Sequence, residues 1–241
     1  MGEEIWISTD VLDFHFDSAG GSFVDESKWK RQYEIWSHTE NILENNPSEH
    51  DLACAIFQLK RTIDFREKHL HDLYSFHRIP TCAGKQKYEI IEEMGIVKPI
   101  LKRKLREIRN LVAHNAAFEV QGIVRIQELH EFVWYFLRAT DSLSAVIANN
   151  FTLYEDNIFW DDNGEWLEIS LNFEGWNIDS IRGDISGERM LNKDVKNSFG
   201  VSLDRPLMKK SNGYHHFVGS IISVPEKPIY NLAKRYFSMQ R

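Results

Sequence analysis

The sequence predicts a mostly α protein, in which a helical bundle is followed by a smaller α+β region with an antiparallel sheet. Between about Asp25 and Asn150, apolar side chains recur at helical spacing in segments joined by short links. After Asn150, residues rich in β-branched and aromatic side chains surround an Asp-Asn-Gly turn, which is typical of a hairpin. We therefore expect an N-terminal extension (residues 1–24), a helical domain (25–150) and an α+β C-terminal domain (151–241).

In the N-terminal segment EEIWISTDVLDFHF, apolar and polar residues alternate as they do in a strand. We consider that this segment returns to the C-terminal sheet. A first helix is expected over residues 26–46, because Trp29, Tyr33, Trp36 and Leu43 recur on one face. Ser48 is the expected N-cap of a second helix, whose apolar stripe is Leu52, Ile56, Leu59, Ile63 and Leu70. Further helices are expected over residues 86–95, 101–118 and 123–150.

The C-terminal domain is expected to begin with a hairpin over residues 151–173. The segment YHHFVGSIISV predicts another strand. Short helices are expected over residues 188–199 and 227–239, where charged and apolar residues alternate at helical spacing.

Composition restricts the class of protein. The chain has 241 residues, a formal net charge of −7 and two cysteines, Cys54 and Cys82, which fit no metal spacing and no disulfide framework. There is no long apolar run, and the first residues lack the pattern of a secretion signal, so we expect a cytoplasmic protein with no membrane partner. Residues 98–109 nevertheless hold six Lys or Arg and one Glu. This basic strip is either a phosphate-binding surface or a solvated helix face.

The spacing Arg, four residues, His occurs three times, at Arg66/His71, Arg109/His114 and Arg125/His130. Only the middle copy has Asn110 beside the arginine and the basic strip just upstream. At about 100° per residue, the apolar stripe of this helix is Leu101, Leu105, Ile108, Val112 and Ala116. Asn110 and His114 lie opposite that stripe, with Arg109 on its flank. They therefore face solvent, a partner subunit or a substrate.

The octapeptide IRNLVAHN resembles the motif of the HEPN family, in which an Arg, often a polar residue, and a later His mark a helical RNase domain. The resemblance covers residues 26–150, and the segment LKRTIDFREK resembles the family's earlier helix with an acidic residue at Asp64 or Glu67. It implies a metal-independent endoribonuclease, with an active site in a cleft between two copies. Such proteins are often toxins or abortive-infection effectors in antiphage defence, and the family also includes non-catalytic binding domains.

The chemistry of these residues suits RNA cleavage. His114 can carry a proton near neutral pH, Arg109 can hold the scissile phosphate, and Asn110 can orient the imidazole or the ribose. Lys102, Arg103 and Arg106 either guide the RNA backbone or are solvated charges. Asp64 and Glu67 either pair with Arg109 or are surface acids.

We expect a homodimer, since two His114 side chains would then supply both acid and base. The RNA partner would be a tRNA or an mRNA. The C-terminal domain would sense a trigger, bind a regulator or select the substrate. No metal ion or cofactor is expected, because His69 and His71 project to different faces of a helix, as do His215 and His216 on a strand. The alternative is a non-catalytic interaction or RNA-binding adaptor module.

Overall fold

The structure is a computed structural model that describes residues 3–113, 122–155, 164–193 and 195–239. The chain divides into two compact units. A sheet unit comprises Met1–Ser22, His77–Ala83 and Ile147–Tyr236, and a helical unit comprises Phe23–Phe76, Gly84–Val146 and Phe237–Arg241.

The predicted fold class is wrong. Among the described residues, helices hold 51% and strands 27%, and the strands form one nine-stranded antiparallel sheet, so the protein is a mixed α+β fold. The sheet is not a small region added after the helices, because it takes strands from both ends of the chain. Local periodicity cannot show this kind of pairing between distant segments.

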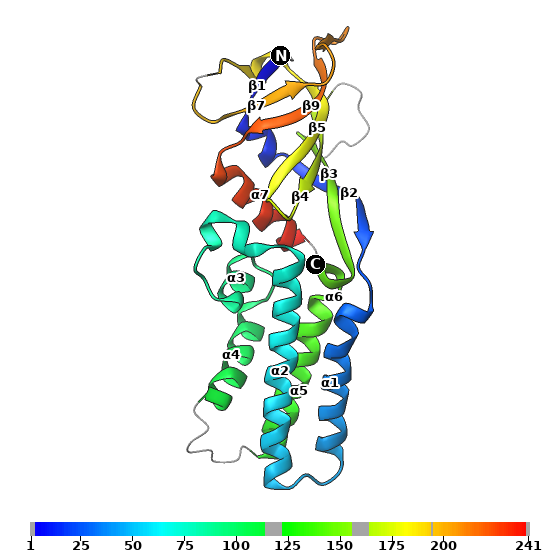
Figure 1. Cartoon of the computed structure of the whole chain (residues 1–241), viewed down its shortest axis with the longest axis vertical. Coiled ribbons are helices and arrows are strands. Elements are labelled where there is room, and N and C mark those ends of the chain that lie inside the picture. Colours follow the sequence, from blue (N-terminus) through cyan, green and yellow to red (C-terminus); the bar gives the residue numbers. More distant parts are fainter. Residues whose placement is uncertain (1–2, 114–121, 156–163, 194, 240–241) are drawn as a thin grey trace. The chain divides into compact units, whose positions relative to one another are not determined.

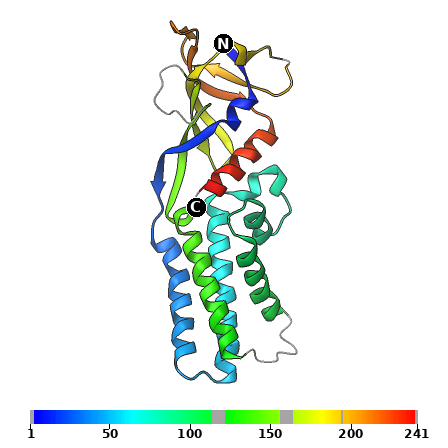
Figure 2. The ribbon, with the colours of Figure 1, turned by 180° about the vertical axis from the view of Figure 1, so that it is seen from behind.

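The helical unit contains α1 (Ser27–Glu44), α2 (Glu49–Leu73), α3 (Lys87–Glu93), α4 (Pro99–Ala113), α5 (Ile123–Ala139) and α6 (Asp141–Ala145). Figures 1 and 2 show α1, α2 and α5 running side by side, and α2 contacts α1, α4 and α5. The expected Ser48 cap is confirmed: its hydroxyl accepts from Asp51 N, and the Asp51 carboxylate accepts from Ser48 N at 2.9 Å. The apolar stripe predicted for α2 is buried along its whole length.

The expected single helix over residues 123–150 is wrong in its last part. The helix is interrupted at Thr140, whose hydroxyl donates back to Phe136 O at 2.8 Å. The short α6 follows, and from Val146 the chain is a strand. Burial alternates from Phe151 to Tyr154, with Phe151 and Leu153 buried, and β3 pairs with β4 over the same residues, so strand pairing overrides the helical pattern.

The sheet unit has the strand order β2-β3-β4-β5-β9-β7-β1-β6, with β8 paired to β9. The strands are β1 (Glu4–Ser8), β2 (His15–Phe23), β3 (Val146–Tyr154), β4 (Trp166–Asn172), β5 (Asn177–Ile185), β6 (Met190–Leu191), β7 (Ser198–Leu203), β8 (Met208–Lys209) and β9 (His215–Ser223). β1 pairs antiparallel with β7, which confirms that the N-terminal strand joins the C-terminal sheet. The hairpin of β3 and β4 is also confirmed, although residues 156–163 of its connection lie outside the described residues.

The strand over residues 215–223 and the helix α7 (Glu226–Met239) agree with prediction. The helix expected over residues 188–199 is wrong, because that segment holds one 3-10 turn and the strands β6 and β7 begin in it. β7 lies between β1 and β9, and pairing on both edges stabilises the extended conformation.

Aromatic rings form part of the core of the sheet unit. Tyr236 of α7 packs against Phe151 and Phe173, with ring centroids 5.3 Å and 5.5 Å away. Arg235 donates to Leu12 O at 2.7 Å. These contacts fix α7 to the strands. Within the described residues, no helix has both the length and the apolar composition that a membrane crossing requires.

Candidate functional site

Helix α4 positions the predicted site. Its apolar stripe is buried at Leu105 and Ile108, which are 3% and 0% exposed. Arg103, Arg106 and Asn110 are exposed and lie three to four residues apart, so they share the outward face. This agrees with the orientation expected from helix geometry. The segment is amphipathic, and burial of its apolar stripe turns the polar residues outward.

Lys102 and Arg109 lie in α4, but their side chains are not among those that the structure describes. His114 lies outside the described residues. The structure therefore brings Asn110 together with Arg103 and Arg106 on one face.

Part of the basic strip is neutralised by neighbouring carboxylates. Arg106 Nη2 lies 3.4 Å from Glu92, with more than half of the arginine side chain exposed, and Lys104 Nζ lies 3.3 Å from Glu107. Arg103 has no ion-pair partner among the described residues. Because the Arg106 side chain is mostly exposed and its contact with Glu92 is long, a polyanionic ligand can compete for this arginine.

The expected acidic partners from α2 behave differently from one another. Asp64 pairs with Lys60 one turn earlier, with Nζ and Oδ2 2.5 Å apart. Glu67 is 5% exposed, so the interpretation of Glu67 as a surface acid is wrong. It lies on the buried side of α2 because the helix packs against neighbours over a broad face.

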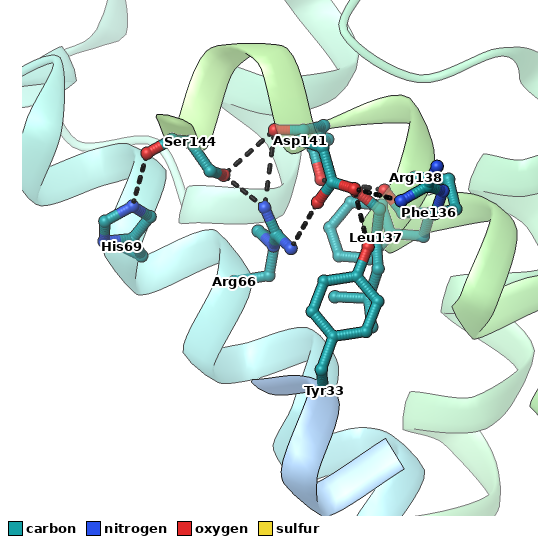
Figure 3. A network of polar contacts seen from close by, with 9 residues as sticks. Tyr33, Arg66, His69, Phe136, Leu137, Arg138, Asp141 and Ser144 are labelled. Atoms are coloured by element: carbon teal, nitrogen blue, oxygen red, sulfur yellow. Dashed lines mark hydrogen bonds and ion pairs between the residues drawn. The ribbon is translucent and has the colours of Figure 1, made fainter. Parts of the chain in front are cut away.

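The first Arg–His copy is part of the interior of the helical unit. Arg66 is completely buried, and its guanidinium donates to Asp141 Oδ1 at 3.0 Å and to the Ser144 hydroxyl. Figure 3 shows Arg66, Tyr33 and Arg138 converging on Asp141 at the start of α6. The Tyr33 hydroxyl donates to Asp141 Oδ2 at 2.7 Å. Burial, together with this hydrogen bond to the carboxylate, raises the pKa of Tyr33 to about 12.

The third Arg–His copy, Arg125 and His130, also makes contacts within the helical unit. Arg125 binds Glu107, with Nε and Oε1 2.9 Å apart. His130 stacks on Trp36 with ring centroids 4.3 Å apart, and each ring bonds the other residue's backbone carbonyl. Burial lowers the pKa of His130. Arg66 and Arg125, the arginines of the first and third copies, therefore have structural partners.

A polar cluster in the sheet unit was not predicted. The Asp184 carboxylate, 4% exposed, accepts from Trp166 Nε1 at 2.7 Å, from Lys210 Nζ at 2.5 Å and from His216 Nδ1 at 2.8 Å. Arg205 Nη2 lies 2.8 Å from His216 Nε2. Because an arginine only donates, Nε2 is the acceptor in this contact and Nδ1 donates to Asp184.

No sequence motif joins these residues. Asp184 and His216 meet because they are opposed in the register of β5 and β9. The alternation of strand side chains shows only that His215 and His216 point to opposite faces, which is correct but does not identify the partner carboxylate.

Comparisons with protein-family models, with curated proteins and with solved structures find no match for this chain. In the part of the chain that the structure describes, there is no group of three or more His, Cys, Asp or Glu side chains placed to hold a metal ion. The assignment of function therefore depends on the chemistry of the residues.

Proposed function

We propose that this protein is a metal-independent endoribonuclease of HEPN type that cuts RNA with Arg109, Asn110 and His114. One observation carries the proposal. Asn110 is exposed on the same outward face of α4 as Arg103 and Arg106, while the apolar stripe of that helix is buried. A helix that presents an amide beside cations is suited to an RNA backbone.

Each residue has a defined role in the proposed reaction. His114 removes the proton of a ribose 2′-hydroxyl or protonates the leaving 5′-oxygen. Arg109 binds the scissile phosphate and the negative charge that develops on it. Asn110 orients the imidazole or the ribose. Arg103 and Arg106, with Lys102, guide the RNA backbone. In a homodimer, two outward-facing α4 helices meet at the two-fold axis and supply one His114 for each proton transfer.

The proposed biological role follows from the resemblance of the motif. The substrate would be a tRNA or an mRNA in the cytoplasm, and the protein would act as a toxin or an antiphage-defence effector of the abortive-infection kind. A trigger or regulator would bind the C-terminal part of the chain.

A non-catalytic RNA-binding adaptor is the second candidate. One observation favours it, namely that Arg103 is exposed on the outward face of α4 and has no ion-pair partner among the described residues. An adaptor needs only an exposed cationic face, without a proton carrier.

Product analysis separates the two candidates. The purified protein is incubated in EDTA with total tRNA and with a long unstructured RNA, and the new ends are identified. Attack by the 2′-hydroxyl predicts 2′,3′-cyclic phosphate and 5′-hydroxyl ends, and no cleavage where the ribose lacks its 2′-hydroxyl. RNA binding that is weakened by Arg103→Ala, without cleavage by the full chain, would replace the nuclease with the adaptor.

A further inference from the structure

A groove lies between α1 and α5 of the helical unit, apart from the α4 face. Its volume is about 430 Å³, within the range of small-ligand sites. Its walls include Trp36, Glu40 and Glu44 from α1 and His130, Glu131 and Trp134 from α5. We call this feature the acidic groove. The proposed ribonuclease does not use it.

The described lining of the acidic groove is negatively charged. Among the described residues that line it, three are glutamates and none is lysine or arginine. No ion pair to Glu40, Glu44 or Glu131 occurs within the described chain. Glu40 and Glu44 are four apart on one helix, where like charges repel by a few tenths of a kcal/mol. All three carboxylates lie near enough to His130 to act on its ionisation.

His130 contributes an acceptor to the groove. It is 7% exposed, and its Nε2 lies 3.2 Å from Trp36 O. A carbonyl only accepts, so Nε2 carries the proton and Nδ1 of the neutral ring is an acceptor. Nδ1 has no hydrogen-bond partner among the described residues. Because burial lowers the pKa of His130, the ring is neutral at neutral pH and adds no positive charge.

Aromatic rings complete the lining. Trp134 and the neighbouring Tyr135 are 37% and 55% exposed, so their rings are accessible to a ligand. The face of an indole or phenol attracts a cation within about 6 Å of its centre. Carboxylates, a ring-nitrogen acceptor and aromatic faces together form a site that accepts hydrogen bonds and favours positive charge.

We propose that the acidic groove binds an organic cation with primary ammonium groups, either a free aliphatic polyamine or the lysine side chain of another molecule. An ammonium group supplies donors to the carboxylates and to His130 Nδ1, and its methylene chain packs on Trp36 and Trp134. This inference is independent of the proposed ribonuclease, so either can fail alone.

Isothermal titration calorimetry of the full chain tests this proposal, with spermidine and a trilysine peptide as separate probes. The groove variant is Glu40→Gln with Glu131→Gln. The control is Glu34→Gln with Glu174→Gln, which makes the same charge change at exposed positions outside the groove. We expect saturable binding that the groove variant weakens at least about tenfold, while the control changes it less than about twofold.

The pattern of binding identifies the source of the cation. Binding of spermidine alone indicates a free polyamine, and binding of the peptide indicates a lysine side chain. If the glutamine pair does not fold, Trp134→Ala is tested in its place. This substitution is at an exposed position, and we expect it to weaken binding. The absence of saturable binding to both probes, or equal weakening by the groove and control pairs, would overturn the proposal.

Discussion

Arg66 is a buried cation whose positive charge is compensated by the carboxylate of Asp141. Removing one partner of a buried ion pair is strongly destabilising, because the other charge is left without compensation. We expect Asp141→Ala to lower the free energy of unfolding by about 3 kcal/mol, measured by urea denaturation. Asp64→Ala, which removes an exposed partner of Lys60, should cost only about 0.3–0.5 kcal/mol. Equal losses in the two variants would mean that the Arg66 network does not stabilise the helical unit.

Asp184 predicts a dependence of stability on pH. Burial alone would raise the pKa of Asp184, but hydrogen bonds from Lys210, Trp166 and His216 outweigh it and hold that pKa below its ordinary value. The folded pKa is then lower than the unfolded pKa, so the unfolded chain binds more protons between the two values. The stabilisation is present above about pH 4 and is lost as the pH falls through the folded pKa.

The Asp184→Asn variant tests this linkage. Urea denaturation between pH 3 and pH 7 should show a smaller loss of stability at low pH in the variant than in the wild type. Parallel curves for the two proteins would show that other carboxylates cause the acid dependence.

The candidate site could be predicted from the sequence only in part. Helix periodicity was enough to place Asn110 on the outward face of α4, where Arg103 and Arg106 also lie. It could not show that Arg66 is buried, because its partner Asp141 lies far along the chain. The Asp184–His216 contact depends on the register of two strands, which no local pattern contains.

At the scale of elements, Gly183 permits the close approach of β4 and β5. A Cβ at this position would lie 2.1 Å from Trp166 O and 2.9 Å from Leu167 Cα, both backbone atoms that cannot move aside alone. We expect Gly183→Ala to lower the free energy of unfolding by about 1–3 kcal/mol. Gly175→Ala should change it by less than about 0.5 kcal/mol, because its Cβ would meet only the mobile tip of the Asn177 side chain. Thermal denaturation of both variants measures the difference, and equal stability would contradict the packing argument.

Elements with strong local signals were predictable, and those decided by distant partners were not. Ser48 begins α2 as expected, since a capping box is encoded within four residues. The segment after Ala145 and parts of the segment after Arg189 were expected to be helical but are strands, because backbone partners from other strands override weak propensity.

At the scale of the whole molecule, the proposed homodimer makes a quantitative prediction. If each cleft needs two His114 side chains, only the wild-type homodimers in an equal mixture with His114→Ala are active. Such a mixture retains about a quarter of the activity of pure wild type at the same total protein concentration. A site within one chain would retain about half. RNA cleavage after subunit exchange measures the fraction, with an equal mixture of wild type and His38→Ala as the control.

The fold class was the largest error in prediction, and its cause is topological. β1 and β2 come from the first residues, yet they lie in the sheet beside strands that follow the helices. The chain leaves the sheet after β2, forms the helical unit and then returns to the sheet at β3. It therefore divides into two compact units rather than a helical domain with a small addition. One N-terminal strand was expected to return to the C-terminal sheet, whereas two, β1 and β2, belong to it.

The most direct test of the proposed ribonuclease is the initial rate of RNA cleavage in EDTA by the wild type, His114→Ala and the control His38→Ala. His38 is an exposed histidine of α1, so its loss leaves the α4 face unchanged. Loss of a general acid–base group predicts a fall of about 10²–10⁴-fold for His114→Ala and an unchanged rate for the control. Equal rates for His114→Ala and the wild type would contradict the account.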